Sequence, residues 1–169
     1  MKIIFLDIDG VLNYNGCKTL TSSGSLFVND NKIKILKEII ERTGAKVVLS
    51  STWRFGWRQL EQGLSDSWAI RDFIELRDKL LEHDIELYDK TPWFDKFIRR
   101  RGEEIAAWLV EHHKDIEGYV IIDDLDGRWL RPCSDHLLQT SPNYGLRQKH
   151  IQIAEKILNN ERCKNGEKI

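Results

Sequence analysis

Acidic and hydroxyl side chains follow three short apolar runs of the chain at the point where each run ends. Asp7 and Asp9 follow the first run, Ser50 follows the second, and Asp123 and Asp124 follow the third. If these runs are neighbouring strands of a parallel sheet, their carboxyl ends share one edge and the side chains converge there. Carboxylates that close repel one another unless a cation or a proton lies between them. Oxygen ligands of this kind suit Mg²⁺, which keeps several waters and often binds a substrate phosphate.

Each acidic pair on its own also has an ordinary structural explanation. A DxDG segment is typical of an Asp-Gly turn after a strand, and Asp123-Asp124 is typical of a strand end in solvent. The coincidence is harder to explain in that way, because a folded protein gains no stability from gathering uncompensated acids. In an extended segment Asp7 and Asp9 also point to the same side. The three strand ends together therefore indicate one site.

Strands and helices are expected to alternate along the chain. The apolar runs have the length and continuity of strands that are covered on both faces, and the segments between them carry apolar residues at helical spacing. The predicted strands are 2–6, 46–49, 85–88, 119–122 and 136–139, and the predicted helices are 31–42, 53–64, 66–82, 103–113 and 150–159. This alternation predicts an α/β fold with a central parallel sheet and helices on both sides.

The expected organisation is a single domain over residues 1–159 with a polar tail over 160–169. Residues 10–30 are rich in Gly, Ser, Asn and Thr, and they contain the tight-turn signal Asn15-Gly16, so a flap is expected after the first strand. Residues 53–100 are longer than one helix and one strand require, which predicts a small helical insert there.

The composition excludes several classes of protein. The 169 residues are 41% hydrophobic and 31% charged, the balance of one globular domain, and the net charge of −1 argues against a strongly basic nucleic-acid binder. No apolar run approaches the ~20 residues of a membrane helix, and the first run stops at Asp7, too early for a signal peptide. We therefore expect a cytoplasmic protein with no membrane partner.

Three cysteines are scattered along the chain, at Cys17, Cys133 and Cys163. An odd number at wide spacing fits neither a disulfide framework nor a zinc site. They are expected to be reduced thiols.

Three segments resemble motifs of the haloacid dehalogenase (HAD) superfamily of phosphotransferases. The segment IIFLDIDGVL resembles the first motif, KVVLSSTWR the second, and YVIIDDLD the fourth, in matching order and spacing over residues 2–126. The segments LSSTWR, RGEEI and IIDD are similar to the HAD domain branch of RNA-repair (Swiss Army Knife) proteins. The resemblance implies a three-layer Rossmann-like fold with a flap after the first strand and no large cap domain.

The resemblance also implies roles for the residues at the strand ends. Asp7 matches the nucleophile that forms an aspartyl-phosphate, and Asp9 matches the general acid/base, whose backbone carbonyl is a metal ligand. Ser50 matches the hydroxyl that binds a phosphoryl oxygen. Asp7, Asp123 and Asp124 match the acids that hold Mg²⁺, with Asp124 as a direct ligand and Asp123 direct or through water.

The third motif of the family is a Lys or Arg at the start of the helix before the fourth-motif strand. Arg101 has that placement, directly ahead of the predicted helix 103–113. Lys90 and Arg100 are the alternatives, and a solvated, charged helix start explains the same stretch without any role in chemistry.

Substrate contacts are expected from the segment that follows the second motif. Ser51 and Thr52 are predicted to offer backbone amides at a helix start. A mixed aromatic and basic cluster comes next, of a kind that stacks on bases and holds phosphates. It consists of Trp53, Arg54, Trp57 and Arg58. Packing of both tryptophans onto the core is an equally good explanation, and Arg54 is the better candidate for a ligand.

The resemblance implies a Mg²⁺-dependent phosphomonoester hydrolase. Its substrate would be a phosphorylated small molecule or a nucleic-acid end, so a polynucleotide end phosphatase is the more specific alternative. A HAD-like fold that serves as a non-enzymatic binding module is the third, and the retention of mutually repelling acids argues against it. The oligomeric state stays open.

Overall fold

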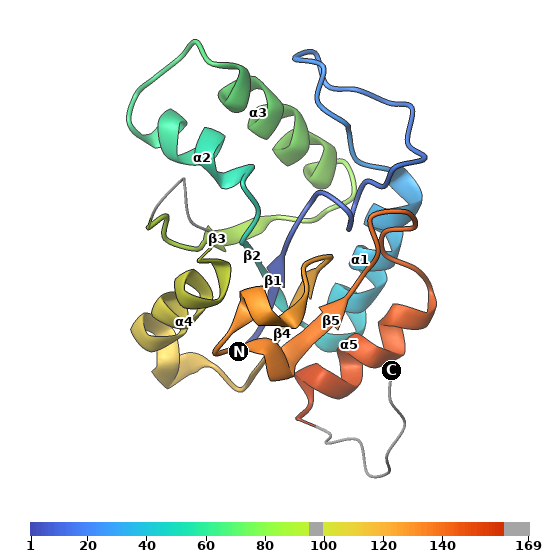
Figure 1. The fold of residues 1–169 in the computed structure, drawn as a ribbon, viewed down its shortest axis with the longest axis vertical. Helices are drawn as coiled ribbons and strands as arrows, with labels where there is room; N and C mark the ends of the chain where they lie inside the picture. The colour runs from blue at the N-terminus through green and yellow to red at the C-terminus, as the bar shows by residue number, and fades with distance from the viewer. Residues whose placement is uncertain (95–99, 161–169) are drawn as a thin grey trace.

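A parallel sheet runs through the centre of the computed structural model, which describes residues 1–94 and 100–160 (Figure 1). Within that part of the chain the strands lie in the order β3-β2-β1-β4-β5, and every neighbouring pair is parallel. They are β1 (Lys2–Leu6), β2 (Lys46–Leu49), β3 (Leu87–Lys90), β4 (Gly118–Asp123) and β5 (Leu137–Gln139). The carboxyl ends of all these strands therefore share one edge, which confirms the predicted α/β class.

Helices cover both faces of the sheet. Ile4 and Leu6 face a core shared with α1 (Asp30–Thr43), α3 (Trp68–Leu81) and α5 (Lys149–Leu158). Ile3 and Phe5 point to the other side, where α4 (Arg101–His112) packs. The alternation follows from the period of two in a strand, and it makes β1 apolar on both faces. The three layers match the Rossmann-like arrangement that the resemblance implied.

Strand β3 lies two residues later than the sequence predicted. The prediction placed it at 85–88, but Ile85 ends the turn after α3, where its amide donates to the carbonyl of Leu80 at 3.0 Å and its side chain is buried. The true strand contains Asp89 and Lys90. An edge strand tolerates such polar residues, so apolar patterning does not identify it.

The predicted flap and helical insert lie beyond the carboxyl edge of the sheet. Helices α2 (Arg54–Glu61) and α3 connect β2 to β3, and both lie within the 53–100 stretch (Figure 1). The flap contains one antiparallel bridge, between Leu20 and Leu26. The Ser22 amide in the flap donates to Glu75 Oε1 of α3 at 3.1 Å, so flap and insert are fastened together. The division into a domain over 1–159 and a tail stays a prediction, because residues 161–169 lie outside the described part.

The structure tests the cysteine and membrane predictions for the described residues only. Cys17 and Cys133 are free thiols, whereas Cys163 lies outside the described residues. Among the helices of the described part, none has the length and apolar character needed to span a membrane.

Helix α5 contains a buried histidine that should make the protein less stable in acid. His150 is 4% exposed, and its Nδ1 accepts a hydrogen bond from the amide of Arg147 at 3.0 Å. Burial, with the charges of Lys149 and Arg147, lowers the pKa of His150 to about 4 from an ordinary value of 6.5. The unfolded chain therefore binds more protons between these two values, and the free energy of unfolding falls as the pH drops through that window.

We expect urea denaturation to show a larger loss of stability between pH 7 and pH 4.5 in the wild type than in His150→Asn, whose amide oxygen keeps the acceptor but does not titrate. Equal losses in the two proteins would contradict this assignment.

Candidate functional site

Backbone hydrogen bonds carry the sheet one residue past its strands and so align the predicted site residues. The amide of Asp7 donates to the carbonyl of Ile122 at 3.0 Å, and the amide of Ser50 donates to the carbonyl of Leu6 at 2.9 Å. Asp7 is 5% exposed, while Ser50 and Asp123 are fully buried. Segments more than 40 residues apart along the chain thus bring a carboxylate, a hydroxyl and a second carboxylate to one edge.

Carboxylate oxygens of Asp7, Asp123 and Asp124 all lie within 4.8 Å of one another. Ligands on opposite sides of Mg²⁺ are about 4 Å apart, so a small adjustment brings these oxygens around one ion. Burial and the neighbouring charge of Asp7 raise the pKa of Asp123 to about 6, and they also raise the pKa of Asp124. Three hard oxygen donors thus lie close together, and such donors fit a magnesium ion.

Arg101 is the cation that faces this cluster. Its Nη1 lies 2.7 Å from Asp7 Oδ2 and 2.6 Å from Asp123 Oδ2. Burial lowers the pKa of Arg101, but the two carboxylates raise it by more, so the net shift is upward and the guanidinium stays charged. Helix α4 begins at Arg101, which directs the side chain from the helix start toward the ends of β1 and β4.

The two alternative cations lie elsewhere. Lys90 pairs with Glu61 at 2.6 Å and its Nζ lies 4.5 Å from the centre of the Trp57 ring. Arg100 binds the exposed side chain of Glu103 through two hydrogen bonds, one of them at 2.8 Å. Of the three candidates, the geometry favours Arg101 for the third-motif role.

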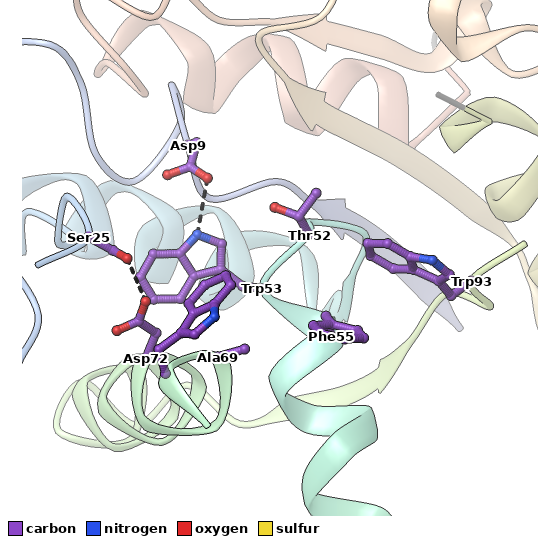
Figure 2. A pocket seen from close by; sticks show the side chains of 9 residues that line it. Asp9, Ser25, Thr52, Trp53, Phe55, Ala69, Asp72 and Trp93 are labelled. Carbon is purple, nitrogen blue, oxygen red and sulfur yellow. Dashed lines mark hydrogen bonds between the residues drawn. The ribbon is translucent and has the colours of Figure 1, made fainter. Parts of the chain in front are cut away.

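Asp9 is held apart from the carboxylate cluster by two donors. Asn13 Nδ2 donates to its Oδ1 at 2.8 Å, and the indole of Trp53 donates to its Oδ2 at 3.1 Å (Figure 2). Asp9 is an exposed residue, but partial desolvation by its neighbours raises the pKa of its carboxyl, and the charge of Asp7 contributes to the increase. A carboxyl with a raised pKa is suited to donate a proton. The predicted metal contact through the Asp9 carbonyl stays a prediction.

Gly10 lets the turn after β1 approach Asp124. A Cβ atom at Gly10 would lie 2.4 Å from Asp124 Oδ2, and the backbone has a φ of +71°. The Gly10 carbonyl accepts a hydrogen bond from Thr140 Oγ1 at 2.7 Å, and the Thr140 amide donates to the carbonyl of Asp123 at 2.8 Å. The residue after β5 thus fixes both acidic strand ends.

The hydroxyl segment after β2 has a buried, unsatisfied donor. Ser50 Oγ makes no hydrogen bond within the described residues. Ser51 is buried, and its Oγ accepts a hydrogen bond from the amide of Trp53 at 3.4 Å, whereas Thr52 is exposed. Because buried polar atoms are normally paired, the orphan hydroxyl of Ser50 beside the carboxylates is suited to a phosphoryl oxygen.

The structure places Arg54 in a buried ion pair, and the substrate contact expected of it stays a prediction. Its guanidinium is buried, forms an ion pair with Glu104 Oε2, and donates to the carbonyl of Ser51 at 2.7 Å. Burial lowers its pKa to about 10, which leaves it charged at neutral pH. The side chain therefore ties the end of β2 to helix α4, and the geometry favours a positioning role.

Three residues of the site were missed by sequence reasoning. Asn13 follows the first motif and orients Asp9, Glu104 sits in the charged helix start and pairs with Arg54, and Thr140 follows the short fifth strand. Thr140 had a usable signal, since it is a hydroxyl residue at a further strand end. The other two look like ordinary polar residues of a turn and a helix start.

A parallel sheet with paired acids after two of its neighbouring strands and a hydroxyl after a third has the architecture of a HAD phosphotransferase domain. A comparison with protein families matches residues 3–151 to the HAD domain in Swiss Army Knife RNA repair proteins, and the chain belongs to that family. A search of curated proteins gave no match. Membership supports a HAD-type, phosphatase-like function.

Two glycines with positive φ give a matched test of the carboxylate cluster. Gly10→Ala and Gly24→Ala should each lose about 1 kcal/mol of stability from the left-handed backbone. Gly24 has open space around its position, so only Gly10→Ala pushes Asp124 aside. We expect MgCl₂ to raise the melting temperature of the wild type and of Gly24→Ala, but not that of Gly10→Ala. A magnesium shift of equal size in both variants would contradict a cluster that depends on Asp124.

Two adjacent glutamates test the link between Arg54 and helix α4. Glu104→Gln leaves the buried guanidinium of Arg54 without its counter-charge, which should cost about 3–5 kcal/mol in denaturant unfolding. Glu103 lies next to Glu104, and Glu103→Gln removes only an exposed partner of Arg100. This substitution should cost less than about 1 kcal/mol. Similar costs for the two variants would show that the buried pair does not hold α4 in place.

Proposed function

We propose that this protein is a Mg²⁺-dependent phosphomonoester hydrolase that acts through an aspartyl-phosphate on Asp7. The observation that carries the proposal is the environment of the Asp7 carboxylate, which contacts the Arg101 guanidinium at 2.7 Å and shares a cluster with Asp123 and Asp124. A carboxylate is already ionised at neutral pH, so it needs no base to become a nucleophile. Its difficulty is repulsion from the substrate phosphate, which nearby positive charge relieves.

In the first step an oxygen of Asp7 attacks phosphorus and the bond from phosphorus to the leaving oxygen breaks. Asp9 gives its proton to that oxygen, and its raised pKa supports this role. Arg101 balances charge on the nucleophile and on the phosphoryl group. The unpaired Ser50 hydroxyl donates a hydrogen bond to a phosphoryl oxygen.

The metal would be held by Asp7, Asp123 and Asp124. When bound, Mg²⁺ supplies the positive charge that lets a carboxylate approach a phosphate dianion. The fully buried Asp123 also accepts a hydrogen bond from the Leu125 amide at 2.9 Å, which fixes the orientation of its carboxylate.

In the second step Asp9 acts as a base. It takes a proton from a water molecule, and the water oxygen attacks the phosphorus of the aspartyl-phosphate. The acyl-phosphate bond breaks, inorganic phosphate leaves, and Asp7 regains its carboxylate. Asn13 and Trp53 hold the Asp9 carboxyl in place for both proton transfers.

Substitutions of the two aspartates in the first motif should impair different steps of the reaction. With an aryl phosphate and Mg²⁺, Asp9→Asn should release one equivalent of phenolate in a burst, because a good leaving group needs little protonation. Its later turnover should be about 10²–10⁴-fold slower than in the wild type, because water is no longer activated. Asp7→Asn should give neither burst nor turnover, and EDTA should abolish the activity of the wild type. Full turnover by Asp7→Asn in rapid-quench measurements would overturn the assignment of the nucleophile.

A further inference from the structure

A cavity of about 310 Å³ opens beside Asp9, and residues of the flap and of the α2–α3 insert also line it (Figure 2). This volume lies at the lower end of the roughly 300–1,000 Å³ of small-molecule pockets. Its walls are largely aromatic, contributed by Trp53, Phe55, Trp68 and Trp93. Because Asp9 protonates the leaving oxygen in the proposed reaction, the group attached to that oxygen is the part of the substrate that enters this cavity.

Asp72 lines the same cavity and keeps one buried oxygen without a hydrogen bond. Its side chain belongs to α3 and is 3% exposed, and its Oδ2 accepts a hydrogen bond from Ser25 Oγ at 2.5 Å (Figure 2). Its other oxygen, Oδ1, makes no hydrogen bond within the described residues. A buried acceptor left unpaired is costly, so a ligand with an N–H group would satisfy it.

Flat aromatic walls, with an unpaired carboxylate oxygen on a lining residue, suit a planar ring that carries N–H donors. We propose that this cavity binds the nucleobase of the terminal nucleotide in a phosphorylated nucleic-acid strand, with the base against the aromatic rings and an N–H group on Asp72. Base stacking on aromatic side chains tolerates every base, because each base has a π-face. The inference rests on the proposed function, since it assigns the leaving group of that reaction.

A second cavity offers a path for the rest of the strand. It measures about 440 Å³ and shares Trp93 with the first. Arg54, Arg58 and Lys90 line it together with Glu61, which pairs with Lys90. The Arg54 guanidinium lies 4.8 Å from the centre of the Trp93 ring and so holds the wall between the two cavities. The guanidinium of Arg58 beside an aromatic surface suits a strand better than a mononucleotide, because a backbone phosphate needs a counter-charge.

Only one of the two tryptophans after the second motif is available for this purpose. Trp57 stacks on Phe73 with ring centres 5.2 Å apart, and it is part of the contact between α2 and α3. Trp53 packs against the core as well, but it also lines the cavity and donates to Asp9. Recognition of the base and orientation of the general acid therefore share one side chain.

The test compares oligonucleotides that carry a 3′- or 5′-terminal phosphate with matched strands whose terminal residue is abasic. For the end that the protein hydrolyses, we expect removal of the base to lower kcat/KM about tenfold or more. In Trp68→Ala, which removes a ring that is 62% exposed, the two substrates should become nearly equal. Phe55→Ala gives a second, independent removal of an aromatic wall and should also reduce the discrimination.

Tyr88→Ala is the matched control. This exposed aromatic residue of β3 packs on Lys46 at the start of β2, and it lines neither of the two cavities. The control should discriminate between the two substrates as strongly as the wild type. Equal kcat/KM for the base-bearing and abasic strands in the wild type would overturn the proposal, as would unchanged discrimination in both Trp68→Ala and Phe55→Ala.

Failure of the proposed function itself gives a different result, namely no hydrolysis of any phosphate ester, including the aryl phosphate. In that case fluorescence anisotropy of labelled strands with the wild-type protein still decides the inference. Binding at least about tenfold tighter to the base-bearing strand, and lost in Trp68→Ala, supports the cavity as a base site. Equal binding of the two strands rejects it.

Discussion

Mutual repulsion among the carboxylates of Asp7, Asp123 and Asp124 is the constraint on which the rest of the site depends. Parallel strands bring these groups within 4.8 Å of one another in a largely buried setting, where repulsion is strong. The guanidinium of Arg101 offsets part of this charge by contacting two of the three acids. The remainder is the charge that a divalent ion would neutralise, so we expect a bound ion to stabilise the fold.

Helix α4 carries Arg101, and contacts along its whole length hold it in place. Near its start, a Cβ atom on Gly102 would lie 2.1 Å from the carbonyl oxygen of Arg131, so only glycine permits this close approach. One turn along, Glu104 pairs with the buried Arg54, and further on Trp108 packs edge-to-face on Phe5 of β1 at 5.3 Å. A buried ion pair contributes little net stability, but it fixes geometry, since either charge left alone would be costly.

The flap and the α2–α3 insert line the cavity beside Asp9. Hydrogen bonds from Ser22 and Ser25 in the flap reach Glu75 and Asp72 on α3, so two segments nearly 50 residues apart enclose one cavity. Trp53 forms part of the wall of that cavity and donates to the general acid candidate Asp9. A ligand that enters against this ring lies within reach of the reacting centre without any large cap domain.

The sequence by itself determined which apolar runs end in acids or a hydroxyl, and it placed Arg101 directly ahead of the helix predicted at 103–113. Such features can be recognised from consecutive residues, because buried strands and helix starts each have a local sequence pattern. Tertiary structure alone decided that Arg54 turns inward to Glu104, that Thr140 fastens the Gly10 turn, that Asp72 keeps an oxygen free, and that β3 lies at 87–90. Such pairings join residues about 50 to 130 positions apart, and long-range packing rather than local spacing selects the partner of a buried polar group.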